Sequence, residues 1–498
     1  MQAAPQDSSG NRQGRPAMIA LAVLVALALF RLWFAGRLEL QGDEAYYRLW
    51  SRRLDYGYYS KGPGIAAIIR VGTALGGDTE RGVRWPAIAF SSGAGWLLYL
   101  IARRLFTARV ALAAVAVGAT VPLFWAGGFL MTIDPPSVFF WLLAAWLFLR
   151  AVEDGGWADW IGAGAAIALG ALCKFTAYAQ LISFAIYLAW IRRERPRPVA
   201  ARTAVLVVVA LTGLALPLLW NARHGWVTFA HLRERGALDQ PFRADLRALL
   251  SFLLGQAAAV SPFYLAALIF SAVRRPWRSG PRASAFRFLV ALIAPLPLLY
   301  AAVSLNGKSE PNWTAPALAL VPVWLAGAGL PLMDSRLAAR RAGIALLALH
   351  AALAIAVHVA LLTPAIYGER PPRFRRIGGA RDLAAQVGAL RDAAAGEFLI
   401  GGNYQTAALL AFYLPDRPQT FVPLGPRPTN PFYFWEDYRR GGRGDTALFV
   451  GDHPPRPDLL EQFERAAPVA VIWSRHHGRP LRRFHVVRLT GLRRPPAE

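Results

Sequence analysis

The chain has 498 residues, of which 55% are hydrophobic and only 17% are charged, whereas soluble domains carry about 25% charged residues. Its formal net charge is +25, but the basic residues lie between long uncharged segments and not on one polar face, which argues against a nucleic-acid partner. The single cysteine, Cys173, excludes an intramolecular disulfide framework and a cysteine-rich zinc site. The composition therefore indicates a polytopic membrane protein.

A helix that crosses a bilayer needs about 17–25 mainly apolar residues. Eleven segments meet or approach this requirement, with two of them, 135–149 and 157–173, marginal in length. In chain order the segments are 16–36, 85–102, 110–133, 135–149, 157–173, 175–191, 203–222, 248–273, 288–307, 311–333 and 342–368. The sequence thus predicts a mainly α-helical protein with about eleven transmembrane helices. An odd number of helices places the two termini on opposite sides of the membrane.

The arginines of the short loops predict the orientation. They gather in every second loop, after the segments that end at 102, 191, 273 and 333, whereas the short loops near 134, 174 and 308 hold only Lys174 and Lys308. Cytoplasmic loops carry the excess of basic residues, so we expect a cytoplasmic N-terminus. We interpret 16–36 as an uncleaved first helix, in which Arg31-Leu-Trp-Phe forms an interfacial anchor.

Three segments are then expected outside the cytoplasm, namely 37–84, 221–247 and the tail. The tail follows a linker rich in proline and arginine at 370–376. Its short apolar runs at 398–400, 447–450, 469–473 and 485–489 alternate with helical patterns at 379–393 and 404–414. Buried strands between helices have this pattern. We therefore predict a transmembrane domain over 1–362 and a small extracytoplasmic α/β domain over 363–498.

Acidic residues near the membrane mark the candidate chemistry. Asp43 and Glu44 directly follow the first predicted helix, where charge is costly unless it has a function or faces water. Asp134 lies between the third and fourth helices on the same predicted side, and as an aspartate before two prolines it is also a candidate helix cap. Two acidic sites on one membrane face indicate a functional site more strongly than either site alone.

Seven motifs in chain order resemble the family 39 glycosyltransferases, membrane enzymes of the GT-C fold that are related to protein O-mannosyltransferases and to the lipid A aminoarabinose transferase. The resemblance spans residues 30 to 330. The motifs are Gly42-Asp-Glu-Ala-Tyr-Tyr47, Leu54-Asp-Tyr-Gly-Tyr-Tyr-Ser-Lys-Gly-Pro63, Gly77-Asp-Thr-Glu-Arg-Gly-Val-Arg84, Thr132-Ile-Asp-Pro-Pro136, Cys173-Lys-Phe-Thr-Ala177, Asn221-Ala-Arg-His-Gly-Trp226 and Glu310-Pro-Asn-Trp313. Where many relatives have His-Pro-Pro or Lys-Pro-Pro, this chain has Lys61-Gly-Pro-Gly64.

The resemblance implies a sugar donor carried on polyprenyl phosphate, whose anomeric carbon is attacked with inversion by a hydroxyl or phosphate oxygen of the acceptor. Asp43 matches the acid that takes or orients the acceptor's proton, and Asp134 and Glu44 are the other two candidate catalytic acids. Preplaced cations must stabilise the departing phosphate. The candidates for this role are Lys61, Arg84 and Lys174, and the motifs add Tyr46, Tyr59, His224, Glu310, Asn312 and Trp313 as further candidate substrate contacts.

The implied partners are the polyprenyl-phosphate sugar, membrane lipids and a glycolipid, glycan or protein acceptor in the bacterial inner membrane. The residues predict no resident metal site, since a His-Glu-x-x-His motif is absent. A divalent cation, Mg²⁺ or Mn²⁺, that bridges Asp43, Asp134 and the donor phosphate is an open alternative. The rival functions are a lipid-linked glycan transporter or flippase and an O-antigen ligase-like protein. A transporter would place ionisable residues in mid-span, and neither rival explains the acidic loops.

Overall fold

The computed structural model describes residues 10–192, 199–237, 239–363, 378–425, 427–440 and 444–494. The predicted linker at 370–376 and the end of the predicted helix at 342–368 lie outside these residues.

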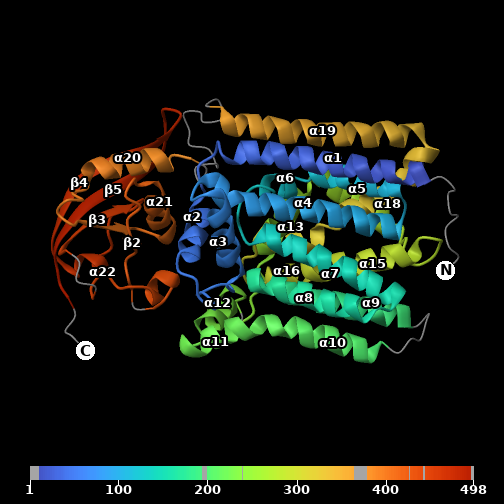
Figure 1. Ribbon diagram of the computed structural model, residues 1–498, viewed down its shortest axis with the longest axis horizontal. Helices are drawn as coiled ribbons and strands as arrows, with labels where there is room; N and C mark the ends of the chain where they lie inside the picture. Colours follow the sequence, from blue (N-terminus) through green and yellow to red (C-terminus); the bar gives the residue numbers. More distant parts are fainter. Residues whose placement is uncertain are drawn as a thin grey trace. The chain divides into compact units, whose positions relative to one another are not determined.

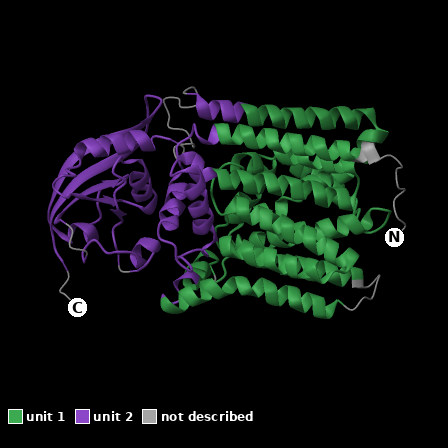
Figure 2. Ribbon diagram, viewed as in Figure 1, with its two compact units in different colours: residues 1–33, 85–223, 229–355 green, residues 34–84, 224–228, 356–498 purple. Residues whose placement is uncertain are grey.

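The chain forms two compact units (Figure 2): unit 1 contains Met1–Trp33, Trp85–Arg223 and Phe229–Ile355, and unit 2 contains Phe34–Arg84, His224–Thr228 and Ala356–Glu498. The first predicted external loop therefore belongs to the same compact unit as the tail, and the predicted domain boundary at residue 362 stays a prediction.

Unit 1 is made of helices that run side by side (Figure 1). They are α1 (Gly10–Ala35), α4 (Glu80–Leu105), α5 (Ala108–Thr120), α6 (Pro122–Gly127), α7 (Asp134–Asp154), α8 (Trp157–Cys173), α9 (Ala179–Arg192), α10 (Ala200–Leu211), α11 (Ala215–Arg223), α12 (Val227–Arg235), α13 (Leu246–Val260), α14 (Pro262–Val273), α15 (Ala283–Ile293), α16 (Pro295–Val303), α17 (Ala315–Leu318), α18 (Val321–Ser335) and α19 (Leu337–Leu362). The first residues of α4 and α12 and the last residues of α1 and α19 belong to unit 2.

Six helical segments in the described part of the chain are long and apolar enough to cross a membrane, and two bent helix pairs raise the number to eight. Three of the shorter apolar helices, Ala108–Thr120, Trp157–Cys173 and Phe175–Ile191, coincide with further predicted spans. Each of the eleven predicted segments thus coincides with a helix, a bent pair or a short apolar helix. The protein is a multi-pass membrane protein, and the count of eleven spans stays a prediction.

Proline lies at two of the three places where the observed helices depart from the predicted ones. The predicted helix at 110–133 is interrupted after Thr120, because Pro122 has no N–H to continue the hydrogen-bond ladder. The predicted helix at 248–273 bends by 100° at Ser261, which precedes Pro262 and has a φ of 94°. The predicted helix at 311–333 bends by 55° between α17 and α18. These breaks keep polar backbone inside the helical unit, which a membrane tolerates only where protein surrounds it.

Unit 2 contains a five-stranded sheet in the order β2-β1-β3-β5-β4. The strands are β1 (Phe398–Gly401), β2 (Thr420–Phe421), β3 (Thr446–Gly451), β4 (Phe463–His476) and β5 (Arg479–Leu492). The strand β1 pairs in parallel with β2 and β3, whereas β5 pairs antiparallel with β3 and β4. The four predicted apolar runs all lie in strands, and the helices α20 (Ala380–Leu390) and α21 (Tyr404–Tyr413) match the predicted helical patterns. The predicted α/β fold of the C-terminal segment is confirmed, and its bounds at 363–498 stay a prediction.

Apolar residues cover both faces of this sheet, which explains why its strands read as continuous apolar runs. Successive side chains of a strand point to opposite faces. Leu399 and Leu448 accordingly pack with the residues of α20 and α21, whereas Phe398 and Phe449 pack in a second cluster on the other face.

Two helices of unit 2 lie in the predicted loop 37–84, α2 (Gly42–Ser51) and α3 (Gly64–Gly76). The helix α2 begins with the acidic motif, and the Glu44 carboxylate accepts a hydrogen bond from the Gln41 backbone N–H at 3.0 Å. This contact caps the helix start. The aromatic and charged composition of the segment concealed its helices.

Candidate active site

Asp43 lies in the first turn of α2, where a carboxylate interacts favourably with the helix dipole. The side-chain amide of Gln405, in the first turn of α21, donates a hydrogen bond of 2.8 Å to Asp43 Oδ1, and the Tyr404 hydroxyl lies 3.5 Å from the same atom. Among the described residues, Asp43 Oδ2 has no hydrogen-bond donor. The carboxylate is therefore held through one oxygen, and its other oxygen is available.

Gly42 makes this arrangement possible. A Cβ atom at this position would lie 2.6 Å from the Cβ of Gln405, closer than side-chain atoms approach. The absence of a side chain lets α2 and α21 come close enough for the amide of Gln405 to reach Asp43. Gln405 is a site residue that the sequence analysis missed, since no motif links it to a carboxylate 362 residues earlier in the chain.

Glu44, one of the candidate catalytic acids, has a different place. It forms an ion pair of 2.6 Å with Arg84, and both side chains are fully buried. Arg84 also donates to the backbone carbonyls of Ala35, Leu38 and Glu39 at 2.7–2.8 Å. The two residues thus hold the start of the first loop, and the predicted roles of Glu44 in catalysis and of Arg84 in phosphate binding stay untested.

A second ion cluster links the first loop to the C-terminal part of unit 2. Asp78 accepts hydrogen bonds from both Arg48 and Arg417, with Arg48 Nε 2.9 Å from its Oδ1 atom. Burial by itself would raise the pKa of Asp78, but the hydrogen bonds and charges of these arginines outweigh it and hold the pKa below its usual value. The cluster stabilises the charged form of Asp78.

Aromatic side chains surround α2 within unit 2. The ring of Tyr46 packs on Tyr404 with 4.3 Å between centroids and stacks on Phe432 at 6.3 Å. Burial raises the pKa of the Tyr46 hydroxyl well above its usual value. His224 contacts Phe434 edge-on at 5.3 Å. Tyr46 and His224 thus have packing roles, and the predicted substrate contacts at these positions stay untested.

Two other candidates of the first loop lie close to each other in sequence and in space. Lys61 is half-buried and pairs through its backbone with Tyr58, whereas Tyr59 is buried. The paired backbone of Tyr58 and Lys61 forms a tight turn directly before α3.

The second acidic site lies in unit 1, where three of the family-like motifs meet. Asp134 begins α7, and Lys174 Nζ donates to its Oδ1 atom at 2.8 Å. Asn312 Nδ2 donates to the other oxygen, Oδ2, at 2.8 Å, and Lys174 also donates to the Asn312 carbonyl at 3.1 Å. The carboxylate therefore binds side chains and is not the cap of its own helix. Lys174 thus neutralises Asp134, and its predicted role at the donor phosphate stays untested.

The segment around Asn312 is itself held in place. The Gln256 side chain donates to the Pro311 carbonyl at 3.2 Å and accepts a hydrogen bond of 2.6 Å from the Thr314 hydroxyl. The two neighbouring candidates also have partners in unit 1, because Glu310 lies 3.9 Å from Lys308 and the ring of Trp313 lies 5.2 Å from the Arg235 guanidinium.

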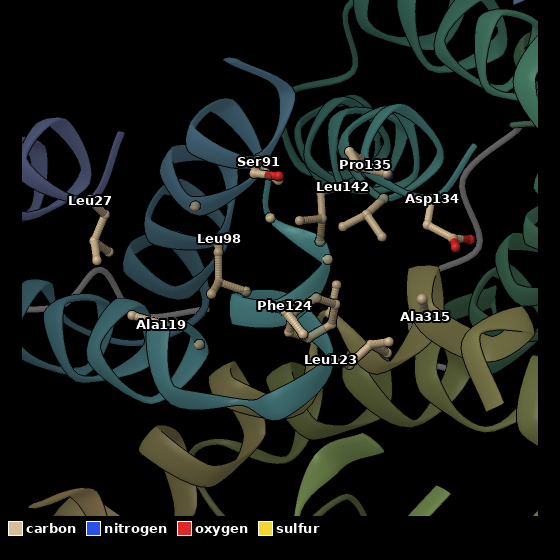
Figure 3. A pocket seen from close by; sticks show the side chains of 18 of the residues that line it. Leu27, Ser91, Leu98, Ala119, Leu123, Phe124, Asp134, Pro135, Leu142 and Ala315 are labelled. Atoms are coloured by element: carbon tan, nitrogen blue, oxygen red, sulfur yellow. The ribbon is translucent and has the colours of Figure 1, made fainter. Parts of the chain in front are cut away.

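A cavity of about 310 Å³ lies in unit 1 next to Asp134 (Figure 3). Leu98, Phe124 and Leu142 project into it, and Asp134 lies at its margin. Its lining comes from α1, α4, α5, α6, α7, α17 and α18 and is apolar except for a few groups, among them Arg31, Ser91, Thr132 and Asp134. The shape and chemistry suit a ligand that is mainly hydrocarbon.

Within the described residues, no group of three or more histidine, cysteine, aspartate and glutamate side chains could hold a metal ion. A cation held by one or two carboxylates and a substrate phosphate needs no such group, so the divalent-cation alternative stays a prediction.

Three comparisons with known proteins bear on this arrangement. Residues 60–220 match the family described as dolichyl-phosphate-mannose-protein mannosyltransferase. The lipid A galacturonosyltransferase RgtD of Rhizobium johnstonii is 28% identical over 311 residues, which are 59% of this chain and 63% of RgtD. The crystal structure of ArnT from Cupriavidus metallidurans in the apo state has a TM-score of 0.62 at 17% identity and covers 95% of this chain and 98% of ArnT. The structure of ArnT bound to undecaprenyl phosphate has a TM-score of 0.60 at 18% identity, with coverages of 96% and 99%.

The likeness to ArnT extends over nearly the whole chain and shows the fold, whereas the match to RgtD spans a little under two thirds of that protein. The chain has the GT-C fold, and the proteins that it resembles in sequence are glycosyltransferases. The predicted resemblance is confirmed.

Proposed function

We propose that this GT-C fold protein is an inverting glycosyltransferase that moves a sugar from polyprenyl phosphate to a cell-envelope glycolipid. The observation that carries the proposal is the Asp43 carboxylate, which the Gln405 amide holds at 2.8 Å through Oδ1 and which keeps Oδ2 for a substrate. A general base needs a fixed carboxylate with an oxygen in reach of the proton that it takes.

The proposed reaction uses the two acids differently. Asp43 Oδ2 takes the proton of the acceptor hydroxyl, whose oxygen attacks the anomeric carbon as the bond to the polyprenyl phosphate breaks. The departing phosphate gains negative charge, and Lys61 is the cation that we assign to it. Both oxygens of Asp134 are engaged by Lys174 and Asn312, so we assign Asp134 to orienting a substrate and not to proton transfer.

The substrates follow from the relatives. RgtD is named for galacturonosyl transfer to lipid A, and one ArnT structure contains undecaprenyl phosphate. We therefore propose an undecaprenyl-phosphate-linked hexuronate as the donor to test first and a lipid A-type glycolipid as the acceptor.

The proposed orientation has a cytoplasmic N-terminus and an extracytoplasmic C-terminal domain, in agreement with the arginine-rich loops. Reporter fusions after residue 498 test it. A reporter that is active only outside the cytoplasm should be active there, and activity of a cytoplasmic reporter would refute the orientation.

The function is tested with purified protein in lipid nanodiscs. The assay supplies lipid A and a series of undecaprenyl-phosphate sugars and measures the release of undecaprenyl phosphate. Asp43→Asn, which keeps the shape and removes the base, should lower the rate by about 10²–10⁴-fold. Asp416→Asn is the matched control, because Asp416 is a half-exposed aspartate of the same unit that pairs with Arg391. Absence of release from every donor, or a fully active Asp43→Asn protein, would refute the proposal.

A further inference from the structure

Arg31 is a buried cation in the first apolar helix. It lies four residues before the end of α1, and only 7% of the residue is exposed. The sequence predicts an interfacial anchor at this position, which would extend its guanidinium towards the membrane surface. The structure instead turns the guanidinium inwards, against the last turn of α6: a Cβ atom on Gly128 would lie 2.6 Å from Arg31 Cζ.

The charge of Arg31 is poorly compensated within unit 1. Among the described residues its one hydrogen-bond acceptor is the backbone carbonyl of Phe124, at a long 3.4 Å, and no carboxylate pairs with it. Charged side chains inside a membrane domain are costly and normally pair with one another or mark a ligand pathway. The missing partner therefore points to a ligand.

The cavity of unit 1 indicates the chemistry of that ligand. Arg31 is one of its lining residues, together with many leucine, alanine and glycine residues. The other charged lining residue, Asp134, is already neutralised by Lys174 at 2.8 Å. The cavity thus combines an apolar wall with one net positive charge, which suits an anion attached to a hydrocarbon chain.

We propose that Arg31 binds the phosphate group of a lipid whose chain lies in this cavity. A planar guanidinium can donate two parallel hydrogen bonds to phosphate oxygens, which explains arginine at this position. The phosphate belongs either to the polyprenyl-phosphate donor or to a phosphorylated glycolipid acceptor. The proposal rests on the proposed function for the identity of these two lipids, but the binding itself requires no sugar transfer.

The test measures equilibrium binding of undecaprenyl phosphate, undecaprenol and phosphorylated lipid A to the full-length protein in nanodiscs. Arg31→Gln removes the charge and keeps an amide donor for the Phe124 carbonyl, so a merely structural role is largely preserved. Arg109→Gln is the matched control, since Arg109 is an exposed arginine of unit 1 that pairs with Asp334. The thermal unfolding midpoint of each variant confirms that it folds.

We expect Arg31→Gln to weaken binding of one phosphorylated lipid by about tenfold to hundredfold, the range of a charge-assisted hydrogen bond, and to leave undecaprenol binding unchanged. Loss confined to undecaprenyl phosphate assigns the donor phosphate, and loss confined to lipid A assigns the acceptor phosphate. Unchanged binding of both, or an equal loss for undecaprenol, would overturn the proposal. The same measurements on Asp43→Asn protein, which is expected to be inactive, separate a failure of this inference from a failure of the proposed function.

Discussion

The hydrogen bond from Gln405 to Asp43 offers a sharp test of how the C-terminal domain contributes to the reaction. In Gln405→Ala, the Asp43 carboxylate loses the donor that lies 2.8 Å from its Oδ1 atom. A hydrogen bond to a charged group contributes about 1.5–3 kcal/mol, and about 1.4 kcal/mol corresponds to a factor of ten in rate. Because Asp43 is half-buried and water can replace the amide, we expect the lower end of the range, a fall in kcat of about tenfold.

The assay is release of undecaprenyl phosphate, with kcat and KM for the donor measured separately. A residue that positions the base should lower kcat and leave the KM for the donor nearly unchanged. Gln386→Ala is the matched control, because Gln386 donates a comparable hydrogen bond of 2.6 Å to Asp382 in the same unit. An unchanged kcat in folded Gln405→Ala protein, or an equal fall in the control, would refute the positioning role.

Three further predictions concern the ion pairs. Glu44→Gln should lower the free energy of unfolding by about 3–5 kcal/mol, because it leaves the Arg84 charge buried and unpaired; an unchanged unfolding midpoint in calorimetry would contradict this. The low pKa of Asp78 in the folded protein means that its stabilisation is present above the usual carboxylate pKa of about 4 and is lost as the pH falls through the folded-state value. When the pH is lowered from 7 to 3, the thermal unfolding midpoint of the parent should therefore fall by more than that of Asp78→Asn. An equal fall in the two proteins would refute the assignment. Lys174→Arg should lower turnover although the charge is kept, since the larger guanidinium displaces Asp134 or Asn312; activity equal to that of the parent would exclude a shape requirement at this position.

Periodicity and composition predicted the architecture because those signals are local. The strands β1 and β3 are apolar on both faces, and the predicted runs at 398–400 and 447–450 lie inside them. The same approach missed α2, since its core residues Tyr46 and Trp50 are interleaved with charged residues and only the contact between Gln41 and Glu44 marks its start.

The pairing of site residues could not be predicted because it depends on tertiary structure. Glu44 and Arg84 are 40 residues apart, and only the folded chain shows that each one satisfies the other. The order of the motifs suggested a set of substrate contacts. The structure instead shows that Lys174 donates a hydrogen bond to the Asp134 carboxylate, and that the Asp43 carboxylate keeps one oxygen without a donor among the described residues. The signal that could have identified Arg31 was present in the sequence, as an arginine inside an otherwise uncharged segment.

The surroundings of the three lysines show at which positions the choice between lysine and arginine matters. The sequence contains three lysines, Lys61, Lys174 and Lys308, and all its other Lys and Arg positions are arginine. Lys308 is 86% exposed and its nearest acid is 3.9 Å away, so either cation would serve there. Lys174 is buried between a carboxylate and a carbonyl, at 2.8 and 3.1 Å, where a compact ammonium fits and a planar fork does not. Lys174 contacts Asp134 and Arg84 contacts Glu44. We assign Lys61 to the donor phosphate as a proposal, and Lys61→Arg and Lys61→Gln, in the half-buried turn before α3, test the shape and the charge of this cation separately.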